Sequence, residues 1–284
     1  MNMRAALTSI AVLAAAAACG GGVWWASTYD ETAAEASEAP APGEAATPLP
    51  VPPVPPRIAE GWRYEKCLGM LNDDAPGASA EAESWQANGG GEAAAHCLAL
   101  AQVAMGNVQI GAEMLEALAA ASSAPPAARA AVYGQAAQAW EMANHIRHAY
   151  DAATKALALS PDDPDLLVDR AVAAGALHRY QDSIDDLNRA LEIDPHRYDA
   201  MVLRGSAWRH LGQLGLAQDD IDRVLLADPD NAEALLERGI LRQRHDDLAG
   251  AQADWERAMR LAPDSATADL AQQNLALLEA GPAQ

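Results

Sequence analysis

A proline recurs at a constant interval through the second half of the chain, at Pro161, Pro195, Pro229 and Pro263, and each closes a similar phrase. The phrases are DLNRALEIDP at 186–195, DIDRVLLADP at 220–229 and DWERAMRLAP at 254–263, with a fainter copy, AATKALALSP, at 152–161. A constant period of this kind is typical of repeat arrays, in which each unit contacts only its neighbours. The sequence therefore predicts a stack of similar units.

The composition indicates that these units are helical. Apolar residues make up 50% of the 284 residues, and much of this fraction is alanine, the best helix former. Phenylalanine is absent, and the alternating apolar and polar runs that are typical of half-buried strands do not appear. We therefore expect an all-α protein in which Trp, Leu and Met supply the bulky side chains.

Small residues recur at fixed positions of the repeat. With each proline at position 32, the units span 130–163, 164–197, 198–231 and 232–265. Position 8 then carries Ala137, Ala171, Gly205 and Gly239. Position 20 carries Ala149, Ser183, Ala217 and Ala251. Position 27 carries Ala156, Ala190, Val224 and Ala258. Two helices cross closely only where small side chains meet. The pattern therefore predicts a pair of closely packed helices in each unit.

This period and pattern resemble the tetratricopeptide repeat (TPR), which has small residues at positions 8, 20 and 27 and proline at 32. The resemblance implies a right-handed alpha-solenoid of about five helix pairs. It also implies that a partner protein or peptide binds in a concave groove and that the chain is not an enzyme. Residues 58–129 are expected to hold divergent TPR-like helices, including a unit at 93–119 and a first pair at 61–87. Residues 266–284 are expected to hold a capping helix and a tail.

An arginine at position 7 and an aspartate at position 23 occur together in three units, so the spacing between them is constant. The pairs are Arg170 with Asp186, Arg204 with Asp220, and Arg238 with Asp254. We interpret them as structural ion pairs between the two helices of one unit. A second arginine follows at position 26, and we expect it to be a second partner on the same helix face. These second partners are Arg189, Arg223 and Arg257.

Positions 5 and 9 of the first helix tend to face the concave side of such an array, and here they are mostly apolar. The predicted groove consists of Val168, Val172, Val202, Ser206, Leu236 and Ile240, with Arg209, Gln243 and Arg244 as polar contacts at its edge. This row favours an amphipathic helix or an extended apolar segment as ligand. The alternatives are that the linker or the capping helix covers the row, that the chain is a permanent subunit of an envelope assembly, or that it serves a separate enzyme.

The segment 1–26 is similar to an export signal, with Arg4 ahead of an uncharged stretch rich in small residues. Three interpretations stay open: a lipoprotein modified at Cys19, an uncleaved helical anchor at 5–26, and a cleaved secretion signal. Each would place the chain on the periplasmic side of the bacterial envelope, attached to the membrane or secreted. Residues 27–57, with eight prolines and five acidic residues, are predicted to form a linker.

Cysteine usage fits an exported chain. If Cys19 is lipidated, Cys67 and Cys97 remain, and an oxidising compartment favours a disulfide between them.

Charge and motifs argue against several other functions. A net charge of −21 repels a phosphate backbone, so nucleic acid is not an expected partner. The sequence has no nucleophile elbow and no glycine-rich phosphate loop, and we expect no catalytic residue, cofactor or small-molecule substrate. His145 and His148 have a spacing that metals use, but no cysteine or carboxylate joins them at ligand spacing, so no metal site is predicted.

Overall fold

The computed structural model describes residues 57–280, and the regular secondary structure of this part is entirely α-helical. Six successive helix pairs are followed by one further helix, α14. The helices are α2 (Trp62–Met70) with α3 (Ala75–Ala87), α4 (Gly91–Ala104) with α5 (Val108–Ala121), α6 (Pro126–Met142) with α7 (Ile146–Leu159), α8 (Pro164–Ala176) with α9 (Tyr180–Ile193), α10 (Tyr198–His210) with α11 (Leu214–Ala227), α12 (Ala232–Arg244) with α13 (Leu248–Leu261), and α14 (Ala266–Ala280).

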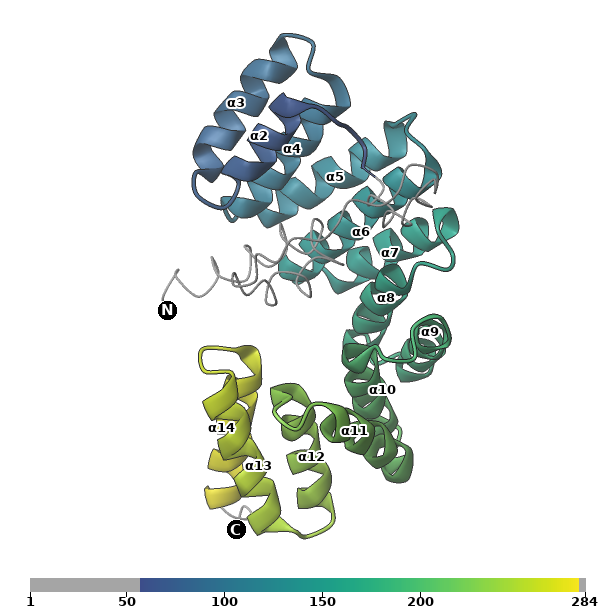
Figure 1. The fold of residues 1–284 in the computed structure, drawn as a ribbon, viewed down its shortest axis with the longest axis vertical. Coiled ribbons are helices and arrows are strands. Elements are labelled where there is room, and N and C mark those ends of the chain that lie inside the picture. The colour runs from purple at the N-terminus through teal and green to yellow at the C-terminus, as the bar shows by residue number, and fades with distance from the viewer. Residues whose placement is uncertain (1–56, 281–284) are drawn as a thin grey trace, which may run out of the picture.

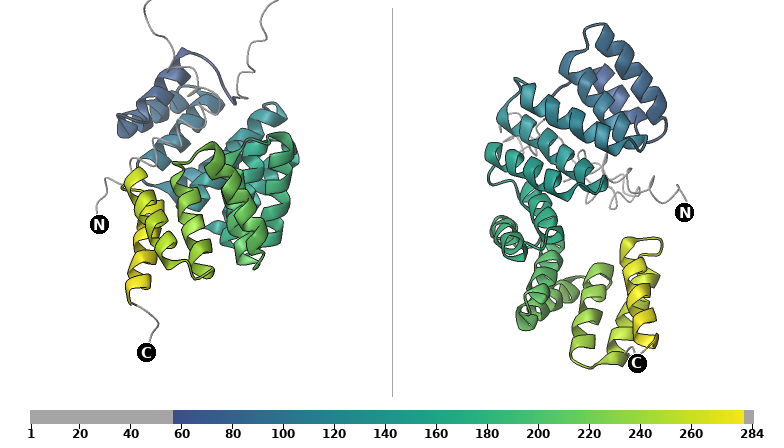
Figure 2. Two further views of the ribbon diagram at one scale, coloured as in Figure 1. Left: turned by 60° about the horizontal axis from the view of Figure 1, so that its bottom comes forward. Right: turned by 180° about the vertical axis from the view of Figure 1, so that it is seen from behind.

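The pairs stack into a curved array with α2 at one end and α14 at the other (Figures 1 and 2). The expected all-α solenoid is therefore confirmed. It has six pairs within residues 57–280 against the expected number of about five, and the first of them lies at 62–87, where a divergent pair was expected. The export signal, Cys19 and the linker up to residue 56 lie outside the described residues.

The recurring proline marks the end of each unit. Helices α7, α9, α11 and α13 all end two residues before this proline. Proline has no backbone N–H and disfavours helical geometry in the residue before it, so the helix cannot continue. The tight turn inside each of the last four pairs has a residue with positive φ at position 15. These residues are Asn144, His178, Gly212 and Asp246.

The small residues at position 8 allow bulky residues at position 24 to fill the space between two helices. Gly239 lies against Trp255, whose side chain is fully buried, and a Cβ atom on Gly239 would collide with the indole ring. In the preceding unit, a Cβ on Gly205 would approach Ile221 Cδ1 to 3.1 Å. Trp255, the largest residue at position 24, therefore faces a glycine at position 8, because the two side chains share one space.

A second, smaller core lies at the N-terminal end of the array. It contains the predicted disulfide, which joins Cys67 on α2 to Cys97 on α4, with their Cα atoms 6.3 Å apart. Both cysteines are fully buried beside Leu71, Ala78 and other small apolar side chains. The disulfide thus ties the first helix pair to the second.

Among the helices of residues 57–280, none has the length and apolar character needed to cross a membrane.

Candidate interaction surface

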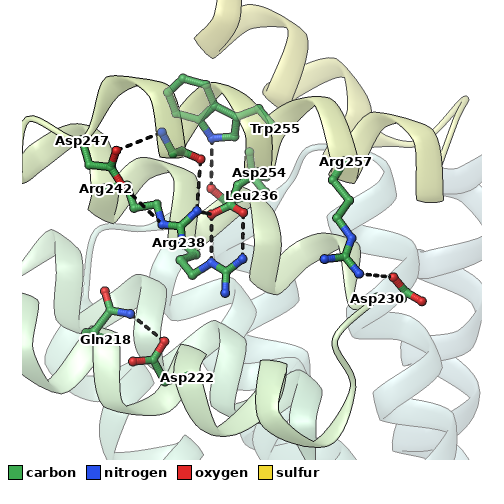
Figure 3. Close-up of polar contacts among 11 residues, drawn as sticks. Gln218, Asp222, Asp230, Leu236, Arg238, Arg242, Asp247, Asp254, Trp255 and Arg257 are labelled. Atoms are coloured by element: carbon green, nitrogen blue, oxygen red, sulfur yellow. Dashed lines mark hydrogen bonds and ion pairs between the residues drawn. The ribbon is translucent and has the colours of Figure 1, made fainter.

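The structure brings each predicted Arg–Asp pair together inside its own unit. In all three units the Arg Nε and Nη2 atoms each donate to one oxygen of the aspartate, at 2.6–2.8 Å. Figure 3 shows one example, Arg238 with Asp254. The aspartates are buried while the arginines reach solvent, so each pair fixes the first helix of a unit to the second.

The second arginines do not bind these aspartates, which corrects the sequence-based expectation. Arg189 binds Asp162 and Arg257 binds Asp230 (Figure 3), at 2.7 and 2.6 Å, and both carboxylates belong to the preceding unit. Each aspartate at position 23 already accepts two hydrogen bonds from the arginine at position 7. The arginine at position 26 instead lies close to the turn that joins the preceding unit to its own, where Asp162 and Asp230 are located. Arg223 forms no ion pair with any residue in 57–280.

The predicted groove residues divide into two groups. Val168, Val202 and Leu236, at position 5, are 8%, 5% and 7% exposed and belong to the continuous core. They therefore do not form an open row, and each first helix packs mainly against the two second helices beside it. The residues at position 9 are only half-buried. These are Val172, Ser206 and Ile240.

Arg209 is not free to bind a ligand at the edge of the groove. Its side chain is buried, and it donates to Glu237 on the next first helix, with Nε 2.7 Å from Oε2 and Nη2 3.1 Å from Oε1. A further hydrogen bond, of 3.1 Å, joins Nη2 to the Ser206 hydroxyl. Gln243 is half-buried and Arg244 is exposed, so these two predicted edge residues remain accessible.

A chain of polar side chains that the sequence analysis did not predict joins the first helices near the N-terminal end. The Tyr64 hydroxyl contacts His96 Nδ1, and His96 Nε2 lies 2.6 Å from Gln135 Oε1. Burial lowers the pKa of His96 to about 4, so the imidazole is neutral at pH 7. The neutral ring accepts from Tyr64 and donates to Gln135. One sequence feature could have indicated this contact: His96 occupies position 5 of its unit, when Ala99 is placed at position 8.

The next contact along the array joins α6 to α8 and is also polar. Gln138 Nε2 donates to both carboxylate oxygens of Asp169, at 3.2 and 3.3 Å. Burial raises the pKa of Asp169 to about 7, an effect that the hydrogen bond from Gln138 opposes and nearby Glu141 reinforces. The contacts between first helices are therefore partly polar. The sequence analysis predicted an apolar row on these helices and did not predict these polar contacts.

We define the first-helix face as the accessible residues of helices α8, α10 and α12 on the side of the array where the residues at position 9 lie. Its centre consists of Val172, Ser206 and Ile240. Acidic residues occupy the N-terminal ends of these helices, and His210, Gln243 and Arg244 occupy C-terminal ends. The acidic residues, all exposed, are Asp165, Asp199 and Glu233. The face thus has an uncharged centre between an acidic border, where Arg197 pairs with Asp165 and Asp199, and a border that carries Arg244.

Replacing Asp220 with alanine should lower the free energy of unfolding by about 1–3 kcal/mol, because the partly buried guanidinium of Arg204 loses its carboxylate. Urea denaturation monitored by circular dichroism measures the change. The control is Asp219→Ala, at an exposed neighbouring position on the same helix, which should stay within about 0.5 kcal/mol of the unsubstituted protein. Equal stability of the two variants would contradict a stabilising role for the ion pair.

Comparison with known proteins supports the repeat fold. No protein-family model matches the sequence, and no curated protein matches it. Among solved structures, YrrB, a TPR protein with an unusual peptide-binding site, is similar with a TM-score of 0.50 and 19% identity. The match covers 69% of this chain and 97% of YrrB.

Two other solved structures are similar to a comparable degree. MamA matches with a TM-score of 0.50 and 14% identity over 58% of this chain and 94% of MamA. The anaphase-promoting complex hetero-tetramer Cut9–Hcn1 matches with a TM-score of 0.57 and 16% identity, over 75% of this chain and 42% of that chain. The protein therefore has the fold of a TPR-like helical-repeat solenoid.

Proposed function

We propose that the chain is a scaffold that binds a partner protein or peptide on its first-helix face. The observation that carries the proposal is the half-buried row at position 9, Val172, Ser206 and Ile240, between an acidic border and a border that carries Arg244. An uncharged strip of this kind suits an extended or helical segment that buries apolar side chains and contacts polar groups on either side. The similarity to YrrB, which is described as having a peptide-binding site, supports the same interpretation.

We also propose that the scaffold works on the periplasmic side of the bacterial envelope, tethered to the membrane through its N-terminus. The sequence of residues 1–26 and the Pro-rich stretch after it support this proposal. A disulfide between two buried cysteines fits an oxidising compartment. Mass spectrometry of the mature N-terminus distinguishes the alternatives: lipid on Cys19, an intact Met1, or a free end after a cleaved signal.

Substitution of Val172 and Ile240 by aspartate should abolish partner capture, because two charges then occupy the centre of the first-helix face. Both side chains are half-buried and pack against the core, so circular dichroism of the variant must show the helical content of the unsubstituted chain for the loss of capture to count. The measurement is affinity capture from envelope extracts after crosslinking, with the full chain and the variant compared by quantitative mass spectrometry.

The matched control is Leu216→Asp, which places a charge at an exposed apolar position of the second helix α11. Partners that bind the first-helix face should be captured by this control and lost from the double variant. An identical set of captured proteins from all three chains would contradict the proposed binding face.

A further inference from the structure

The arginine at position 26 has a carboxylate partner in two units but not in the unit between them. Arg189 binds Asp162 and Arg257 binds Asp230, and each partner occupies position 33 of the preceding unit. The corresponding residue for Arg223 is His196, which offers no carboxylate. The array thus contains one ion-pair position in which the acidic member is missing.

A cavity of about 340 Å³ is lined by Arg223 and by Pro195, the residue next to His196. It lies between helices α9, α10 and α11 and has both apolar and charged walls. The lining residues are Asn188, Leu191, Glu192, Pro195, Met201, Arg204 and Arg223.

The other charged residues of this cavity already have partners. Arg204 donates from Nε and Nη2 to Asp220 and from Nη1 to Asn188. Glu192 accepts from Arg189 at 2.8 Å. Arg223 is therefore the lining cation that retains the capacity to bind an anion, as judged from its contacts within residues 57–280.

An exposed leucine lies one helical turn beyond Arg223. Leu226 is 85% exposed, the highest value among the exposed large apolar residues of the described chain. The same position of the other units carries Ala158, Glu192 and Arg260. Residues three apart on a helix are neighbours on its surface. An apolar side chain beside an arginine is typical of the central contacts of protein interfaces.

We propose that the cavity and Leu226 form a second interaction site, in which Arg223 binds the aspartate or glutamate side chain of a partner protein. A guanidinium can bind a carboxylate through two parallel hydrogen bonds, as Arg204 does with Asp220, or through one oxygen, as Arg189 does with Asp162. An apolar residue next to the acidic one packs on Leu226. Because the net charge of −21 repels polyanions, the ligand is a single acidic residue in an apolar context.

This site is independent of the proposed first-helix face. Arg223 and Leu226 belong to the second helix α11, whereas Val172, Ser206 and Ile240 belong to first helices. The two sites can therefore be tested separately, and a chain with both would connect two partners.

The test uses NMR titration of the full chain with N-acetyl-aspartyl-leucine amide, with N-acetyl-asparaginyl-leucine amide as the neutral control. The Arg223 Nε–Hε signal and the Leu226 methyl signals should shift in a saturable manner with the aspartyl dipeptide. Binding of the asparaginyl dipeptide should be about tenfold weaker or more, because it lacks the charge-assisted pair. Loss of the signal in Arg223→Gln assigns the guanidinium resonance.

Two substitutions test the missing-carboxylate argument in opposite directions. His196→Asp supplies the carboxylate within the chain and should abolish dipeptide binding while the protein remains folded. Asp230→His removes the partner of Arg257 and should create a second, weaker site, because Arg260 occupies the position that Leu226 has beside Arg223. Absence of any Arg223 shift with the aspartyl dipeptide, unchanged binding in His196→Asp, or equally strong binding of inorganic phosphate would overturn the proposal.

Discussion

Replacing Trp255 with alanine should lower the free energy of unfolding of the C-terminal helices by about 3–5 kcal/mol. The Trp255 side chain is fully buried against Gly239, and its indole N–H donates to the Leu236 carbonyl at 3.2 Å. Because the facing residue is glycine, no neighbouring side chain fills the space that the indole leaves. The substitution also leaves a backbone carbonyl without this partner.

The loss should be confined to helices α12, α13 and α14, since each unit of a repeat array contacts only its neighbours. Hydrogen exchange should therefore accelerate in these helices and remain unchanged in α6 and α7. Trp62→Ala is the control, because Trp62 is 78% exposed and its loss should change stability by less than about 0.5 kcal/mol. Unchanged exchange rates in α13 of the Trp255→Ala protein would disprove the predicted packing.

Reduction of the disulfide between Cys67 and Cys97 should destabilise the opposite end of the array by about 3–4 kcal/mol. The bridge closes a loop with a sequence separation of 30 residues, which sets the size of the chain-entropy effect. The core around it contains Leu71, Leu98 and three alanines, and four further apolar side chains pack against it. The bridge therefore adds to this apolar core in holding the first helix pair to the second.

A protein with both cysteines replaced by serine should show rapid hydrogen exchange in α2 and α3 and normal exchange in α8 to α13. Adding dithiothreitol to the unsubstituted protein should have the same effect. The doubly substituted protein supplies the control, since the reductant should not change its exchange any further. Full protection of α2 in the reduced protein would contradict this prediction.

The repeat register predicted the architecture because the same constraint acts in every unit. Small residues at position 8, the proline at position 32 and the constant spacing between arginine and aspartate all describe contacts inside one helix pair. Such contacts depend on the local geometry of two helices, which a repeated pattern records several times. The ion pairs formed by Arg170, Arg204 and Arg238 could therefore be assigned from the sequence.

Contacts between units were harder to predict because they depend on how closely the pairs stack. The burial of Val202 and Leu236 in the continuous core depends on how each first helix packs against the second helix of the preceding unit, which no single unit determines. The ion pair of Arg209 with Glu237 occurs at one place in the array and thus leaves no repeated pattern. The contact of Tyr64 with His96 joins residues far apart in the divergent N-terminal part, where the register itself is displaced.

The two kinds of ion pair have different consequences for how such an array can grow. The pair between positions 7 and 23 lies within one unit, so duplication of a whole unit copies both partners together. The pair between positions 26 and 33 crosses a boundary, so it forms only when the unit inserted next to it carries the matching residue. Duplication thus preserves the stability of each unit, while each new junction either gains an ion pair or, as at His196, leaves an arginine available for new contacts.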